Sequence, residues 1–121
     1  MMNVPGEILG VMIVGHNSRT AMLLEVAAMF KRTTGMAIVD AADMETLEEA
    51  FGRCAEQGAT MVVVHPYFLL PGKHATVDVP KLAATAAEKF GIKFCVTEPL
   101  GVDEAIVKVI EQRIVECLET R

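Results

Sequence analysis

Short apolar runs alternate with segments of helical periodicity along the whole chain, and this alternation limits the fold more than any other feature. The runs cover residues 8–15, 36–39, 61–64 and 92–96. Each is short and almost wholly apolar, as strands buried on both faces of a parallel sheet are. The sequence therefore predicts an α/β fold in which a strand and a helix alternate four times.

The segments after these runs carry apolar residues at the spacing of amphipathic helices. Asn17 and Ser18 are candidate caps of the first helix, and Asp78 is a candidate cap of the third, with Pro80 in its first turn. The helices are expected to cover both faces of the sheet. The expected inward-facing residues are, helix by helix, Met22, Leu23, Val26, Ala27, Met29 and Phe30; Leu47, Ala50, Phe51, Cys54 and Ala55; Leu82, Ala83, Ala86 and Phe90; Ile106, Val109, Ile110, Ile114 and Leu118.

The order of the four strands follows from the handedness of their connections. Right-handed crossovers favour the flavodoxin-like order 2-1-3-4, in which the first and third strands are neighbours and the winding direction reverses between them. Ligands of open α/β sheets bind in that crevice, outside the carboxyl ends of the strands. We therefore expect the functional residues to follow the first and third strands.

Length and composition indicate one domain over residues 1–121, with an apolar fraction of 52% that is high for a small chain. Part of this apolar surface is expected to cover a subunit interface, most simply in a homodimer. No apolar stretch is long enough to span a bilayer and the N-terminus lacks a signal-peptide pattern, so a cytoplasmic location is expected. The net charge of −5, without a basic cluster, argues against nucleic acid as a partner.

The three cysteines show no spacing typical of a zinc or redox motif. Cys54, Cys95 and Cys117 are widely separated and odd in number. We expect them to be reduced and buried as small apolar side chains.

All three histidines lie where the expected topology places a binding site. His16 follows the first strand, His65 ends the third, and His74 lies in the long segment 65–77 beyond it. Imidazole binds borderline divalent metals such as Co, Fe, Ni or Zn and accepts protons near neutral pH. Two histidines alone make an open and weak metal site, which suits an ion that passes through. The alternative is that loop histidines only bond to nearby backbone groups.

Other polar residues flank the same crevice. Ser18 and Arg19, at a helix start, and Lys73 are candidates for binding a carboxylate or phosphate. Asp43 and Glu45 follow the second strand and are candidates to orient a histidine or relay protons. Each of these residues is equally typical of an ordinary solvated surface.

Three segments, in order, resemble motifs of one family. VGHNSR, VVVHPYFLLPGKHATVDVP and EPLG are similar to motifs of the short-form class II tetrapyrrole chelatases, the sirohydrochlorin cobaltochelatase and ferrochelatase family. The resemblance implies insertion of Co or Fe, and also Ni, into sirohydrochlorin or a related polycarboxylate tetrapyrrole for cobalamin or sirohaem. The metal is then a substrate, and no tightly bound cofactor is expected.

The resemblance also implies roles for individual residues. His16 and His74 would bind the metal and accept the two pyrrole protons, while Ser18, Arg19 and Lys73 would bind the acidic side chains of the macrocycle. Short members form homodimers that restore a two-lobed enzyme.

The segment after the second strand, DAADMETLEEAF, is shorter than its counterpart in the family. The acidic group that assists the histidines is therefore Glu45, Asp43 or absent. Two alternatives to the enzyme remain: a non-catalytic paralogue that binds metal or tetrapyrrole, and a flavodoxin-like regulatory domain.

Overall fold

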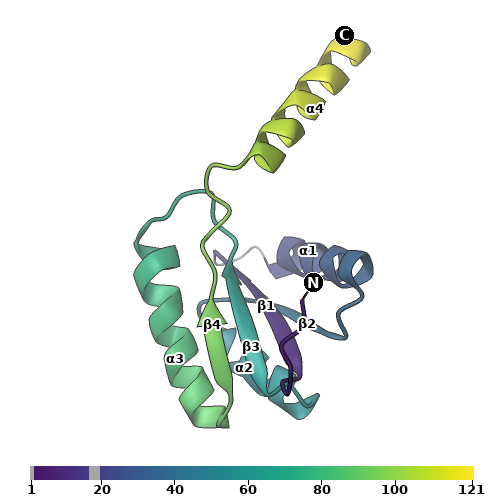
Figure 1. The fold of residues 1–121 in the computed structure, drawn as a ribbon. Helices are drawn as coiled ribbons and strands as arrows, with labels where there is room; N and C mark the ends of the chain where they lie inside the picture. The colour runs from purple at the N-terminus through teal and green to yellow at the C-terminus, as the bar shows by residue number, and fades with distance from the viewer. Residues whose placement is uncertain (1, 17–19) are drawn as a thin grey trace.

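The structure, a computed structural model, describes residues 2–16 and 20–121. Its centre is a parallel sheet in the order β2-β1-β3-β4, with helices on both faces (Figure 1). This order confirms the expected 2-1-3-4 arrangement. The strands are β1 (Leu9–Gly15), β2 (Ile38–Asp43), β3 (Met61–Pro66) and β4 (Lys93–Val96). The helices are α1 (Thr20–Thr34), α2 (Leu47–Glu56), the π-helical turn η1 (His74–Asp78), α3 (Val79–Phe90) and α4 (Glu104–Thr120).

The position of β2 differs from the sequence prediction. The strand was expected over residues 36–39, but it begins at Ile38 and extends to Asp43, paired with β1 up to Gly15. Its last four residues, Asp-Ala-Ala-Asp, have low strand propensity. Pairing with the buried β1 overrides that propensity and carries β2 to the same sheet edge as the end of β1.

The main core lies between the sheet and the helix pair α2 and α3. Met12 and Val64 point to this face from the strands, and Phe51 fills the space between them with no exposed surface. A smaller core on the other face joins Ile13 to Leu23 of α1. Two helices therefore cover one face, whereas α1 alone packs on the other.

Several burial predictions were wrong because they assumed that every apolar stripe packs on the sheet. Met22 and Met29 of α1 are 46% and 57% exposed, since α1 buries only a narrow stripe through Leu23 and Ala27. Helix α4 buries no residue, because it extends past the end of β4 and away from the sheet (Figure 1). Cys54 is buried as expected, but Cys95 and Cys117 are exposed.

Gly15 allows α1 to approach the end of β1 closely. A Cβ atom added at this glycine would lie 2.7 Å from Cδ2 of Leu23, which is closer than real side chains pack. Because Gly15 has no Cβ atom, Leu23 of α1 packs directly against the end of β1, next to His16.

None of the helices formed by residues 20–121 combines the length and the apolar character that a bilayer crossing requires.

Candidate functional site

His16 and His74 meet beyond the carboxyl ends of β1 and β3. Their rings lie edge to face, with centroids 5.7 Å apart and planes at 80°. Both side chains are exposed to solvent. Since metal–nitrogen bonds of imidazole are about 2 Å long, this separation lets both rings reach one ion. The strand order therefore brings together two histidines that are far apart in the sequence.

A π-helical turn presents His74. The turn η1 runs directly into α3, and the N–H of Val79 donates to the carbonyl of His74, five residues back. Pro80 explains this local widening, because proline has no N–H and its ring would clash with the carbonyl four residues earlier in a regular helix. Such π turns are frequent at functional sites.

Asp78 is the carboxylate that contacts His74. Its Oδ2 lies 2.9 Å from Nδ1 of His74, one helical turn away. An ionised carboxylate can only accept, so Nδ1–H of His74 donates and Nε2 keeps a free lone pair for a metal or a proton. The sequence prediction that Asp78 caps α3 was wrong: its side chain makes no capping bond. The i, i+4 spacing of His74 and Asp78 could have indicated this pair, had the helical turn been expected.

A hollow of about 480 Å³ lies beside the two imidazoles. Lys73 lines it together with His16 and His74, while the rest of its wall is largely apolar. That wall consists of Tyr67, Phe68, Leu69, Leu70, Gly72 and Ala75. Within residues 2–16 and 20–121, no cluster of three or more His, Cys, Asp or Glu side chains could hold a metal. The described residues thus offer two nitrogen ligands, one cation and an apolar wall, which suits weak metal binding and proton transfer.

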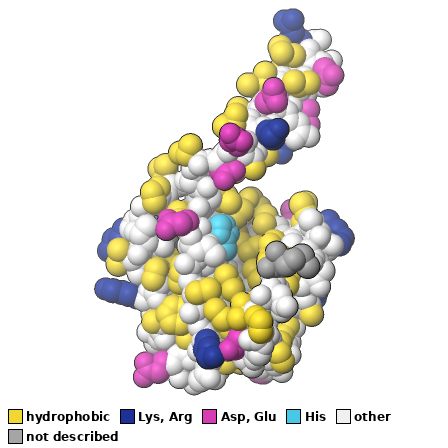
Figure 2. Space-filling model, viewed as in Figure 1, with side chains coloured by type: hydrophobic (Ala, Val, Ile, Leu, Met, Phe, Trp, Pro, Cys, Tyr) yellow, Lys and Arg dark blue, Asp and Glu magenta, His cyan; other side chains and the backbone are white. Residues whose placement is uncertain are grey.

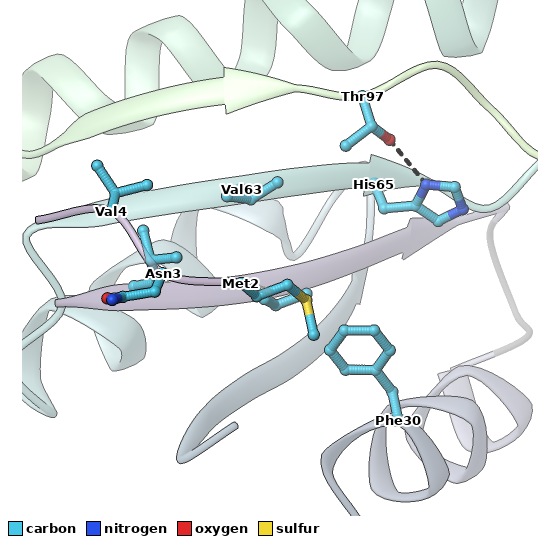
Figure 3. A pocket seen from close by; sticks show the side chains of 9 residues that line it. Met2, Asn3, Val4, Phe30, Val63, His65 and Thr97 are labelled. Carbon is cyan, nitrogen blue, oxygen red and sulfur yellow. Dashed lines mark hydrogen bonds between the residues drawn. The ribbon is translucent and has the colours of Figure 1, made fainter. Parts of the chain in front are cut away.

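His65 is separate from this pair. Its Nδ1 lies 2.8 Å from Oγ1 of Thr97, whose hydroxyl donates to the carbonyl of Glu98, so the His65 N–H is the donor (Figure 3). Burial lowers the pKa of His65 below its usual value. Of the three histidines that sequence analysis grouped, two come together and the third faces the α1 side of the sheet.

Asp43, the last residue of β2, and Glu45 do not line the histidine hollow. Asp43 is buried, and its Oδ1 accepts from the backbone N–H groups of Glu45 and Thr46, both at 2.9 Å, and from the Thr46 hydroxyl at 3.1 Å. The Asp43 carboxylate therefore holds the turn into α2. The Glu45 side chain is exposed. The candidate residues Ser18 and Arg19 lie outside the described part of the chain.

Comparison with known proteins agrees with this geometry. The CbiX family model matches residues 10–117, which is most of the chain. The chain belongs to the CbiX family. This membership confirms the resemblance that the three sequence motifs indicated.

Several curated relatives are chelatases. The chain is 43% identical to the chloroplastic sirohydrochlorin ferrochelatase of Arabidopsis thaliana, over 93% of this chain and 54% of that protein. It is 30% identical to the sirohydrochlorin cobaltochelatase of Methanosarcina acetivorans, over 93% of this chain and 98% of that protein. The chain spans about half the length of two of these relatives, the plant enzyme and the sirohydrochlorin ferrochelatase of Bacillus subtilis.

A solved structure shares the fold. The sirohydrochlorin chelatase SirB from Bacillus subtilis subspecies spizizenii, in complex with cobalt, superposes with a TM-score of 0.76 at 32% identity. The match covers 89% of this chain and 50% of that one. This CbiX chain therefore corresponds in fold to about half of that chelatase.

Proposed function

We propose that this CbiX-family protein inserts a divalent metal ion, Co or Fe, into sirohydrochlorin or a related polycarboxylate tetrapyrrole. The observation that carries the proposal is the convergence of His16 and His74, with ring centroids 5.7 Å apart, above a hollow that also contains Lys73. The names of the relatives, sirohydrochlorin ferrochelatase and cobaltochelatase, support the same reaction.

The two imidazoles would deliver the metal ion to the macrocycle and accept the protons that the ion displaces. Metal insertion places one divalent ion among four pyrrole nitrogens and releases two N–H protons, so the reaction needs a metal donor and a proton acceptor. Neutral imidazole does both, because the same nitrogen lone pair binds an ion or a proton. The Asp78 carboxylate, 2.9 Å from Nδ1 of His74, keeps Nε2 available for this role. With only two protein ligands, the ion is held weakly enough to leave for the macrocycle.

The wall of the hollow matches the chemistry of the other substrate. Tyr67, Phe68 and Leu70 offer apolar surface for a flat conjugated ring. Lys73 offers a positive charge for one of the many carboxylates at its rim. We include Ser18 and Arg19 in the substrate site on the resemblance alone.

The proposed active form is a homodimer. The chain spans about half of the Bacillus subtilis ferrochelatase and almost the whole of the archaeal cobaltochelatase. Two copies would provide the two lobes between which a macrocycle binds.

The expected cytoplasmic location stays a prediction, which fractionation of the source cells would check.

An anaerobic conversion assay tests the proposal. Sirohydrochlorin is mixed with Co²⁺ or Fe²⁺ and followed by absorbance, with the protein, without it, and with the variants His16→Ala, His74→Ala and His65→Gln. We expect a protein-dependent rate that falls at least about a hundredfold in the first two variants, as loss of a general base does. His65→Gln is the matched control, because His65 lies outside the hollow, and it should keep its rate.

Two results would contradict the proposal. Folded wild-type protein that gives no rate above the metal-only control, with either metal, would exclude the enzyme. If such protein still bound metal or sirohydrochlorin in a titration, it would be a non-catalytic paralogue rather than an enzyme. An equal rate loss in His65→Gln would show that the effect is not specific to the histidine pair.

A further inference from the structure

The helix that carries His74 is widened over one turn only. At its start, the N–H and the hydroxyl of Thr76 both donate to the Gly72 carbonyl at 3.0 Å, four residues back, as the N–H groups of a regular α-helix do. Three residues later, the Val79 N–H donates to the carbonyl of His74, five residues back. The widening therefore lies between Thr76 and Val79, directly before Pro80.

Helix α3, which continues from this turn, is fixed on the sheet by its buried side. Val79, Ala83 and Ala86 have no exposed surface and belong to the main core. Helix α4, by contrast, stands apart from the globular part of the molecule and buries no residue (Figure 2). The rotation of η1 about its helix axis is therefore set by the hydrogen-bond register that joins it to α3.

This register decides where His74 points. A π turn holds one more residue than an α turn, and successive residues of an α-helix are rotated by about 100° about the axis. With α3 fixed, a change from π to α register would rotate His74 by about this angle and move a side chain at the helix surface by about 8 Å. The His74 side chain is 53% exposed, so packing does not hold the ring in place. Its centroid now lies 5.7 Å from that of His16, and after such a rotation the two rings would no longer reach one ion.

We propose that Pro80 is a positioning residue, whose ring keeps η1 in the π register and thereby directs His74 toward His16. Proline has no N–H to donate to the Thr76 carbonyl, and in the α register its ring would clash with that same carbonyl. Pro80 does not line the histidine hollow, so it acts only through the backbone. The register is a property of the fold, whereas its effect on a metal ion rests on the proposed function.

The first measurement determines the register and needs neither substrate nor metal. Scalar couplings across hydrogen bonds, measured by NMR on the full chain, identify the carbonyl to which each N–H donates. In the wild type, the Val79 N–H should couple to the His74 carbonyl. In Pro80→Ala it should couple to the Ala75 carbonyl, because alanine removes the clash and supplies the missing N–H. Lys81→Ala is the matched control, since it introduces alanine at the next, exposed position and keeps the proline, and it should retain the wild-type coupling.

The second measurement is the affinity for Co²⁺ alone, obtained by calorimetric titration. Pro80→Ala should bind Co²⁺ at least about tenfold more weakly than the wild type, the usual effect of losing a group that orients a metal-binding histidine. Its affinity should approach that of His74→Ala, whereas Lys81→Ala should bind as the wild type does. Chemical denaturation checks that Pro80→Ala is folded, which we expect because alanine favours a helix more than proline does.

Two results would overturn the proposal. One is a Pro80→Ala protein that keeps the coupling between the Val79 N–H and the His74 carbonyl. The other is a changed register with wild-type affinity for Co²⁺, because the turn would then not position the ring. A His74→Ala protein that binds Co²⁺ as tightly as the wild type would instead contradict the proposed function, and the register measurement alone would then decide the role of Pro80.

Discussion

Asp78 and His74 are joined by a 2.9 Å contact between Oδ2 and Nδ1, four residues apart in a π-helical turn. The contact fixes which nitrogen of His74 carries the proton. It also leaves Nε2 unprotonated on a ring whose centroid lies 5.7 Å from that of His16. A carboxylate orients metal-binding histidines in the same way in many proteins. Under the proposed function, Asp78 would position His74, and His74 would act as ligand and base.

Asp78→Asn should lower the metal-insertion rate about 10 to 100-fold, the usual effect of losing such a carboxylate. The amide of asparagine can donate to Nδ1, which would move the proton of His74 to Nε2 and block the reactive nitrogen. The rate is measured across pH 6 to 8, where a change of base should also change the shape of the profile. Glu88→Gln, on the exposed side of α3, is the control and should leave both the rate and the shape of the pH profile unchanged. An unaltered rate in Asp78→Asn would contradict the positioning role.

Asp43 should matter for stability rather than for the reaction. Asp43→Ala removes an acceptor of three hydrogen bonds at the start of α2 and should lower the free energy of unfolding by about 1 to 2 kcal/mol. Asp43→Asn keeps an oxygen acceptor and should retain most of the stability and the full rate. Chemical denaturation and the conversion assay measure the two effects. A stable Asp43→Asn protein with a lost rate would instead support the acid/base role that the sequence suggested.

His65 should make the protein less stable in mild acid. Burial lowers its pKa in the folded chain, so below the ordinary value of about 6.5 the unfolded chain binds the proton more readily. The free energy of unfolding therefore falls as the pH drops from 6.5 toward the folded pKa. Chemical denaturation at pH 7.5 and 5.5 should show this loss in the wild type and a smaller loss in His65→Gln. Equal losses in the two proteins would exclude His65 as the cause.

Glu7 should affect the stability of the protein in a lower pH range than His65 does. Hydrogen bonds from Lys93 and Thr60 lower the pKa of its carboxyl group below 4.5. The stability from this group is present above that value and is lost as the pH falls through the folded pKa. Denaturation curves of Glu7→Gln should therefore differ from those of the wild type in their pH dependence below 4.5 and match it between 5.5 and 7.5. A difference confined to the higher range would contradict this assignment.

Cys54 should be inert to thiol reagents in the folded protein. Burial is the main reason that the pKa of its thiol is raised to about 11, and only thiolates react readily. In the double variant Cys95→Ser, Cys117→Ser, the remaining thiol should be modified at the rate of global unfolding. Denatured protein supplies the control, because there the same thiol should react at once. Fast modification of the folded protein would show that this part of the core opens.

The sequence by itself determined the fold class, the strand order and the group of three histidines expected at one edge of the sheet. The order 2-1-3-4 follows because buried parallel strands read as short apolar runs and right-handed crossovers leave few arrangements. The three histidines were predicted to lie together because residues at and after the ends of the first and third strands of such a sheet meet at one edge; the choice of His16 and His74 came from the family resemblance. These features depend on local patterns and on general rules of chain connection.

Only the tertiary structure decided the details that depend on contacts between distant segments. The extension of β2 to Asp43 comes from pairing with β1, and the separation of His65 from His16 and His74 comes from the side of the sheet that each side chain faces. The link between His74 and Asp78 depends on a π turn that the sequence pattern does not distinguish from a loop. Helix α4 shows the same limit, because its apolar stripe predicts a helix packed on the sheet, whereas the helix buries no residue in the structure.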